Sequence, residues 1–319
     1  GDNLAIILFG AITLFVAFVG YELIHRIAMA LSVLSGIMLL ASGVILLSER
    51  PAAMVSGALP PHFAIGTFIL VVTQAAAWSL SSAPYVADYS RYLPVDVSAW
   101  KTFWYTGAGN YFGSVLPQAL GAYLASTRPA MVADIGASIA GLFGSGRYVV
   151  ALLIIVNLLQ VNVMNLYSAY MSSTTTVTGL KGMRRVSLTF KFVVMAILMS
   201  IATVLAIATK GNFSVLFSDF LVMLVYVLIP WSAINLADYY IVCKGRYSIE
   251  HMFLKDGAYG VYRWKTLGVY IVSILIEAPF MRLSFYTGPV AERIGADIAW
   301  LPGLVIPALL YTLIERRRI

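Results

Sequence analysis

Residues 78–94 read Trp-Ser-Leu-Ser-Ser-Ala-Pro-Tyr-Val-Ala-Asp-Tyr-Ser-Arg-Tyr-Leu-Pro and end an apolar run that begins at Phe63. Pro84 has no backbone N–H and its ring clashes with a preceding helical turn, and the residue before a proline is biased away from the helical region. We therefore predict a helix within residues 63–94 that is broken near Ser81. Broken backbone at membrane depth survives only where protein packs around it or where it lines a wet cavity. The break indicates either a ligand site of the kind transporters use or a proline-kinked structural helix.

The composition is that of an integral membrane protein. Apolar residues make up 61% of the 319 residues and charged residues 11%, whereas a soluble domain typically has about 25% charged residues. Cys243 is the single cysteine, which excludes an internal disulfide and a cysteine-based metal site. The three histidines are dispersed, so no metal site is assigned.

A membrane-spanning helix needs about 20 mostly apolar residues. Nine ranges of about this kind are present: 4–20, 28–47, 63–82, 100–124, 148–171, 190–208, 215–234, 267–281 and 298–314. No domain-sized loop separates them. We expect an all-helical, single transmembrane domain over residues 1–319.

The placement of Lys and Arg predicts the orientation, because cytoplasmic loops are enriched in these residues. With nine spans, about 15 of the 21 Lys and Arg residues fall on the side that holds the C-terminus. We expect a multi-pass protein of the cell membrane with a cytoplasmic C-terminus. Gly1 then lies outside, which predicts an odd number of missing upstream helices and thus an N-terminally truncated chain. The net charge of +7 is interpreted as a topology signal, with anionic lipid of the cytoplasmic leaflet as its partner and no nucleic acid.

Several stretches resemble the nucleobase:cation symporter-1 family, the cytosine, purine, hydantoin, allantoin and thiamine-type permeases. They occur in the family's order and are residues 20–26, 83–94, 230–240, 245–247 and 277–280. The resemblance implies that the nine spans are the family's helices four to twelve, with the first three absent. It also implies a LeuT-like fold of two inverted five-helix repeats and two peripheral helices, with substrate at the midplane between helices one, three, six and eight.

The broken helix carries the first set of candidate substrate-binding residues. Trp78 lies where the resemblance places an aromatic that stacks on a planar substrate, although a Trp packed inside the bundle is the plainer interpretation. The hydroxyls beside the break could bind substrate or bond to the preceding helical turn, and Gln74 could face the site or a neighbouring helix. The candidates are Gln74, Trp78, Ser79, Ser81 and Ser82.

The second set consists of amides within residues 148–171. Asn165 falls where the resemblance implies an asparagine that bonds the substrate, and an amide can both donate to and accept from a heterocycle edge. Gln160 and Asn162 are further candidates, while Asn157 lies more than two turns away and is expected to be structural. The alternative for all of them is hydrogen bonding between helices. Leu159 and Gln160 stand where sodium-coupled relatives place hydroxyls, so the coupling cation, Na⁺ or H⁺, stays open.

Charged residues near the membrane surfaces are predicted to be structural or part of a gate. Asp88 and Arg91 have the i,i+3 spacing that lets them meet on one helical turn, and Asp238 is expected to have the same kind of role. Glu277 lies inside an apolar run, and an intramembrane acid is a functional candidate by default. Because the resemblance makes its helix peripheral, a structural role is favoured.

Together these observations predict a secondary active transporter of nucleobases or related planar heterocycles, driven by a cation gradient and working by alternating access. An amino-acid or vitamin permease of the same fold is the alternative, and a membrane receptor that does not transport is a third. An enzyme is not expected, because no phosphate loop, nucleophile elbow or paired catalytic carboxylates occur. No cofactor is predicted.

Overall fold

The computed structural model describes residues 1–19, 21–48, 63–85, 90, 93–132, 134–181, 186–254, 256–257, 259–260 and 262–315. These residues form helices and one isolated antiparallel bridge between Arg282 and Thr287, without a strand, which confirms the all-helical prediction. The chain divides into two compact units. The first unit comprises Gly1–Pro61 and Ala87–Gly211, and the second unit comprises His62–Val86 and Asn212–Ile319.

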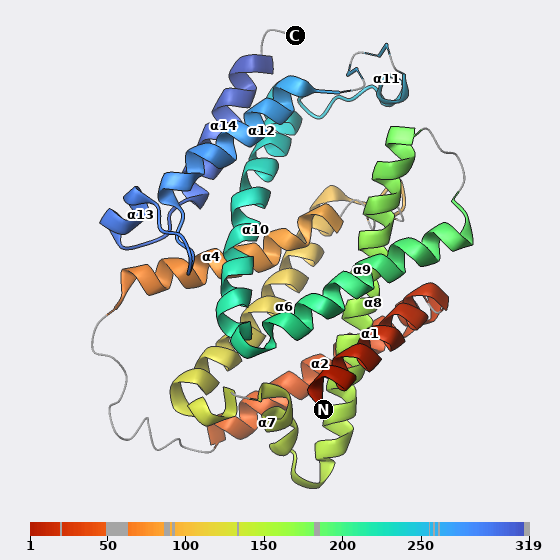
Figure 1. Cartoon of the computed structure of the whole chain (residues 1–319), viewed down its shortest axis with the longest axis vertical. Coiled ribbons are helices and arrows are strands. Elements are labelled where there is room, and N and C mark those ends of the chain that lie inside the picture. The colour runs from red at the N-terminus through yellow and green to blue at the C-terminus, as the bar shows by residue number, and fades with distance from the viewer. Residues whose placement is uncertain are drawn as a thin grey trace. The chain divides into compact units, whose positions relative to one another are not determined.

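Long helices build the first unit. They are α1 (Asp2–Val19), α2 (Tyr21–Ser48), α6 (Ala99–Thr127), α8 (Arg147–Lys181) and α9 (Leu188–Thr209), with a short α7 (Ile135–Gly141) between the 3-10 turns η2 (Pro129–Val132) and η3 (Gly144–Gly146). The helix α8 packs against α1, α2, α7 and α9, so it is the centre of this unit (Figure 1). A 3-10 turn, η4 (Lys210–Asn212), follows α9.

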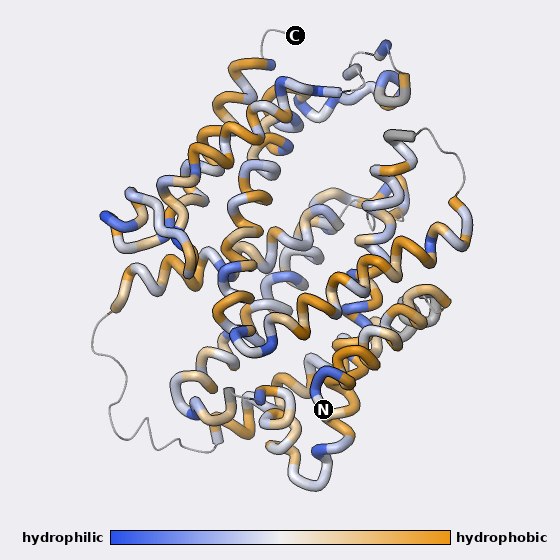
Figure 2. The backbone as a smooth tube through the Cα atoms, viewed as in Figure 1, coloured by the Kyte–Doolittle hydropathy of each residue, from blue (hydrophilic) through white to orange (hydrophobic). Residues whose placement is uncertain are grey.

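The core of the first unit lies between α1, α8 and α9. It is formed by Ala17, Val163, Leu166, Tyr170 and Met195, all buried. At the edge of this core the Lys191 ammonium donates to the backbone oxygen of Phe18 at 3.2 Å, with its charge 5.2 Å from the Phe18 ring centre. The helix α9 is apolar along most of its length (Figure 2), as expected of a segment that faces lipid and other helices.

Close approach of α1 to α9 depends on Gly10. A Cβ atom at Gly10 would come within 2.7 Å of the Thr203 hydroxyl oxygen, and this hydroxyl is held by its own bond to the Met199 carbonyl at 2.8 Å. We expect Gly10→Ala to lower the free energy of unfolding by about 1–3 kcal/mol, the usual cost of overpacking. Gly43→Ala in α2 is the matched control, because nothing lies within 4 Å of its added Cβ. Thermal unfolding of both variants in detergent checks this, and equal melting temperatures would contradict it.

The second unit is organised around α10 (Phe213–Leu236), which packs against α4 (Ile65–Ser81), α12 (Trp264–Glu277) and α14 (Trp300–Glu315) (Figure 1). The helix α10 continues directly into η5 (Ala237–Val242), a π-helical turn. Shorter elements complete the unit: the 3-10 turns η1 (Ala83–Tyr85) and η6 (Ala278–Phe280), α11 (Ile249–Phe253) and α13 (Pro289–Ile294).

The predicted break after residue 81 is present. The α-helix α4 ends at Ser81, the Ser82 N–H bonds to the Leu80 and Ser79 carbonyls, and the chain continues as the 3-10 turn η1. Pro84 lies in the middle of this turn, where its missing N–H removes no α-helical hydrogen bond. The proline thus ends the α-helix where the sequence indicates.

All nine ranges expected to span the membrane overlap helices of the two units. Among the described residues, four stretches are long and apolar enough to cross a bilayer: Asp2–Val19, Ala28–Ser48, Gly144–Gly179 and Leu188–Val242, the last of which contains both α9 and α10. The helices Ile65–Ser81 and Trp300–Glu315 are apolar but shorter. The apolar helices support a multi-pass membrane protein, while the number of spans and the inverted-repeat fold stay predictions.

Candidate functional site

The last turn of α4 presents Trp78. Its side chain is 53% exposed, and its indole N–H makes no hydrogen bond to the part of the chain that the structure describes. The Ser81 hydroxyl donates to the Trp78 carbonyl at 2.7 Å, so it bonds to the preceding turn as the local alternative anticipates. Ser79 is half-buried and Ser82 exposed. This end of α4 therefore offers an open aromatic face beside a helix terminus.

Gln74 fixes α4 to its neighbour. Its side-chain amide donates to the Ser218 hydroxyl of α10 at 2.6 Å. One turn further along, Ala77 is fully buried in a cluster with Val225 and Ile229 of α10. Gln74 and Ala77 thus define the face of α4 that is held against α10, and Gln74 faces a neighbouring helix.

The four amides of α8 differ in what they bind. Asn157 and Asn162 donate to the carbonyls four residues earlier, those of Leu153 and Leu158, at 2.7 and 2.8 Å. Gln160 makes only a long contact, 3.9 Å, to the Met164 sulfur. Asn165 is exposed and has no hydrogen-bond partner among the described residues. Of these side chains, Asn165 is the one whose donor and acceptor groups are both available.

The candidate residues lie in different parts of the structure. Gln74, Trp78, Ser79, Ser81 and Ser82 belong to the second unit, and Gln160, Asn162 and Asn165 to the first. Asp88 and Arg91, expected to form a structural or gate pair, lie outside the described residues. The roles of all these residues stay predictions.

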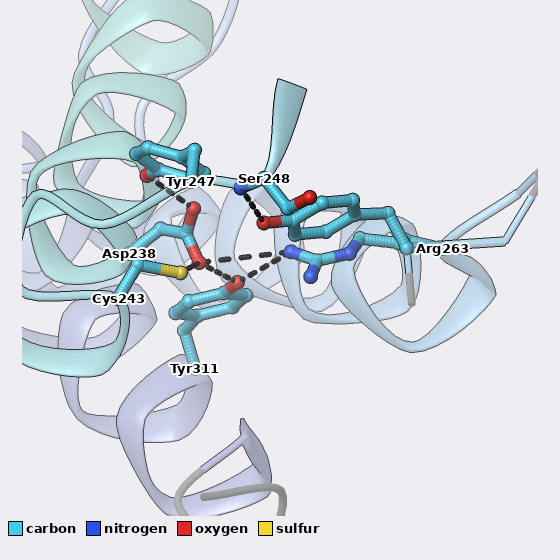
Figure 3. Close-up of polar contacts among 7 residues, drawn as sticks. Asp238, Cys243, Tyr247, Ser248, Arg263 and Tyr311 are labelled. Carbon is cyan, nitrogen blue, oxygen red and sulfur yellow. Dashed lines mark hydrogen bonds and ion pairs between the residues drawn. The ribbon is translucent and has the colours of Figure 1, made fainter. Parts of the chain in front are cut away.

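Asp238 is the centre of a polar cluster at the end of α10. Its carboxylate accepts hydrogen bonds from Tyr247 at 2.7 Å and from Tyr311 at 2.6 Å, and it lies 3.6 Å from the Arg263 guanidinium. The Cys243 thiol contacts the same carboxylate at 3.5 Å. Figure 3 shows these side chains converging on Asp238 of η5: Cys243 and Tyr247 from the segment after η5, Arg263 from just before α12, and Tyr311 from α14. We call these five residues the Asp238 cluster.

The local electrostatics favour the protonated form of the donors that surround Asp238. Burial, followed by the hydrogen bond to Asp238, raises the pKa of Tyr247 above its usual range. Burial and the nearby Asp238 charge raise the pKa of the Cys243 thiol. Both groups therefore stay protonated near neutral pH and can donate to the carboxylate. Because Arg263 also donates to the Tyr311 hydroxyl at 3.1 Å, the cluster joins three helices through one acid.

The sequence predicts a structural or gate role for Asp238, but not its partners. Tyr311 lies 73 residues from Asp238, and no spacing rule connects residues that far apart. Tyr247 belongs to the Gly-Arg-Tyr stretch at residues 245–247, one of those that resemble the nucleobase:cation symporter-1 family, and this resemblance is the signal that the sequence offers for it. Among the described residues no group of three or more His, Cys, Asp or Glu could hold a metal ion.

Comparison with known proteins places the chain in a family. Residues 1–303 match the family described as permease for cytosine/purines, uracil, thiamine, allantoin. The chain is 39% identical over 318 residues to the "Putative purine-cytosine permease YxlA" of Bacillus subtilis (strain 168), a match that covers 99% of this chain and 68% of that protein. No solved structure matches the chain. Since the family match extends over nearly all of the residues, the chain belongs to the family of permeases for cytosine, purines, uracil, thiamine and allantoin.

Proposed function

We propose that this protein is a secondary active transporter that carries a nucleobase or a related planar heterocycle across the cell membrane by alternating access, driven by a cation gradient. In this proposal Trp78 stacks on the substrate ring, and Asn165 with the backbone around Ser79, Ser81 and Ser82 binds its polar edge. The C-terminus faces the cytoplasm, as the distribution of Lys and Arg favours.

The observation that supports this proposal most strongly is the exposed ring of Trp78 at the end of α4. A Trp of the packed core would be buried, whereas this side chain is 53% exposed and its N–H has no described partner. Stacking suits this class of substrates because every nucleobase has a π-face. Family membership makes a planar heterocycle the substrate class to test first.

Counterflow in liposomes tests the proposal directly. Purified protein would be reconstituted with an excess of unlabelled cytosine, uracil, hypoxanthine, hydantoin or allantoin inside, and entry of the same labelled compound would be followed. A transporter gives transient accumulation of label, whereas a receptor that only binds gives none. Absence of counterflow with every compound, from protein that still binds one of them, would contradict transport.

We expect Asn165→Ala to weaken substrate binding about tenfold at every sodium concentration, because one lost hydrogen bond at a site that was built around it costs about 1–2 kcal/mol. Asn157→Ala is the matched control on the same helix, since that side chain bonds back to Leu153. Equilibrium binding with and without sodium measures both variants. If Asn165→Ala keeps parental affinity and loses only a sodium dependence, this residue serves the cation and not the substrate.

A further inference from the structure

Glu277 is a fully buried acid that has no hydrogen-bond partner among the described residues. It is the last residue of α12, its side chain is 0% exposed, and neither carboxylate oxygen has a hydrogen-bond partner in the described part of the chain. The nearest hydroxyl on its own helix, that of Ser273, bonds back to the Val269 carbonyl at 2.7 Å. Glu277 is thus buried without the contacts that normally accompany a buried acid.

The carboxyl group of Glu277 is packed against α14. A Cβ atom at Gly303 would come within 2.4 Å of Oε1 and 2.7 Å of the carboxyl carbon, so the acid lies on the bare backbone of this glycine. Among the described residues, Asp297, Tyr226 and Tyr270 lie close enough to Glu277 to interact with it electrostatically. None of these three is a cation.

Charged and titratable groups on the elements around Glu277 interact with other residues. The Arg282 guanidinium donates to the Gly295 carbonyl at 2.8 Å, and the titratable groups of α14, Tyr311 and Glu315, interact with Arg263, the residue just before the other end of α12. Glu277 therefore forms no ion pair within the described ranges.

Two other buried acids of the second unit show the contrast. Asp297 accepts hydrogen bonds from the Tyr226 hydroxyl, from the Arg282 N–H at 2.7 Å and from the Ala299 N–H at 3.0 Å. Asp219 accepts from both the backbone N–H and the hydroxyl of Ser284. The oxygens of these two carboxylates thus have hydrogen-bond donors, whereas those of Glu277 have none among the described residues.

A buried carboxylate with neither donors nor a counter-charge is far less stable than the neutral acid. A metal cation such as Na⁺ is an unsuitable substitute, since it needs several oxygen ligands and space, and Glu277 offers one carboxyl group packed against Gly303. A proton needs no further ligand and no space. The environment of Glu277 therefore fits one ligand, a proton.

We propose that Glu277 is the proton-binding residue that couples substrate transport to the proton gradient. The inference rests on the transport function proposed above. The carboxylate takes one proton from water on the side of higher proton activity, and the neutral acid is then buried in the conformation described here. A conformation that admits water from the other side lets the acid release the same proton there, so one proton crosses with the substrate.

The test compares two kinds of transport in liposomes that contain the protein or a variant. With labelled cytosine or hypoxanthine at equal concentrations inside and outside, exchange of the label needs no net proton movement. With an acidic outside and a neutral lumen, accumulation of the labelled compound inside requires protons to enter with it. We expect Glu277→Gln, which resembles the neutral acid in shape, to keep exchange within about twofold and to lose at least tenfold in accumulation driven by the pH gradient. A pH-sensitive dye in the lumen should report acidification on substrate addition with the parent and none with Glu277→Gln.

Glu292→Gln is the matched control, because Glu292 is an exposed acid on α13; it should behave as the parent in all three measurements. Accumulation by Glu277→Gln at the parental level, or accumulation by the parent with a sodium gradient alone, overturns the proposal. Failure of the parent to exchange any substrate contradicts the transport function instead.

An infrared spectrum tests the proton site independently of transport: the parent at neutral pH should show a protonated carboxyl band that is absent in Glu277→Gln. Absence of this band from the parent overturns the proposal, even if the variant does not fold.

Discussion

Replacing Trp78 by alanine should weaken binding of the preferred heterocycle by roughly 5- to 150-fold. Stacking of a base on an aromatic side chain contributes about 1–3 kcal/mol, and each 1.4 kcal/mol is about tenfold in affinity. Because the side chain is 53% exposed, its removal creates no large cavity, and the melting temperature should change little. Equilibrium binding of labelled cytosine, uracil, hypoxanthine, hydantoin and allantoin, measured beside thermal unfolding, separates the two effects.

Two variants make this experiment specific. Trp78→Phe should keep much of the affinity because a flat aromatic face remains. Trp264→Ala removes another exposed Trp of the second unit, 69% exposed at the start of α12, and should leave affinity unchanged. A folded Trp78→Ala protein that binds as tightly as the parent would show that substrate does not stack on this ring.

Replacing Asp238 by alanine should lower the free energy of unfolding by about 3–5 kcal/mol, because it removes two hydrogen bonds to a charged group that each contribute about 1.5–3 kcal/mol. The substitution leaves the Tyr247 and Tyr311 hydroxyls without their acceptor and Arg263 without its counter-charge. We expect the melting temperature to fall sharply while ligand affinity of the folded fraction stays near that of the parent. Thermal unfolding with and without cytosine provides both values.

A variant that removes only one hydrogen bond to Asp238 gives a reference for the stability lost in Asp238→Ala. Tyr247→Phe removes one hydrogen bond to a charged group and should cost about 1.5–3 kcal/mol, less than Asp238→Ala. If Asp238→Ala is as stable as Tyr247→Phe, the Asp238 cluster does not stabilise the packing of α10, α12 and α14 through its central acid. Full stability combined with lost transport would instead assign Asp238 to a gate.

The positions of the helices can be predicted from the sequence because long apolar runs mark them. The ends of the helices are predicted less accurately. The predicted range 148–171 corresponds to α8, which continues to Lys181. The added residues are rich in Ser and Thr, and their hydroxyls bond to carbonyls of the preceding turn, as Thr176 does to Ser172 at 2.9 Å. Such bonds satisfy hydroxyl groups within the helix, so polar composition does not end it.

The candidate site is only partly predictable for a different reason. The effect of Pro84 on the helix is confined to the residues next to it in the sequence, so the end of α4 could be inferred from a few residues. The hydrogen bonding of each amide depends on what packs beside it. Sequence spacing does not distinguish Asn162, bonded to Leu158, from Asn165, which has no hydrogen-bond partner among the described residues. The unpaired burial of Glu277 likewise depends on Gly303, which belongs to another helix.

The π-helical turn η5 determines the direction in which side chains face after α10. In this turn the Cys243 N–H bonds to the Asp238 carbonyl five residues earlier, at 2.7 Å, where an α-helix would use the residue four positions earlier. Return to α-helical bonding would advance the chain after η5 by one residue, a rotation of about 100° around the helix axis. Tyr247 and Asp238 would then no longer face each other. The π-helical turn therefore sets the rotation of the chain that follows α10, and deleting one residue within Ala237–Val242 other than Asp238 is expected to restore α-helical bonding and turn Tyr247 away from Asp238.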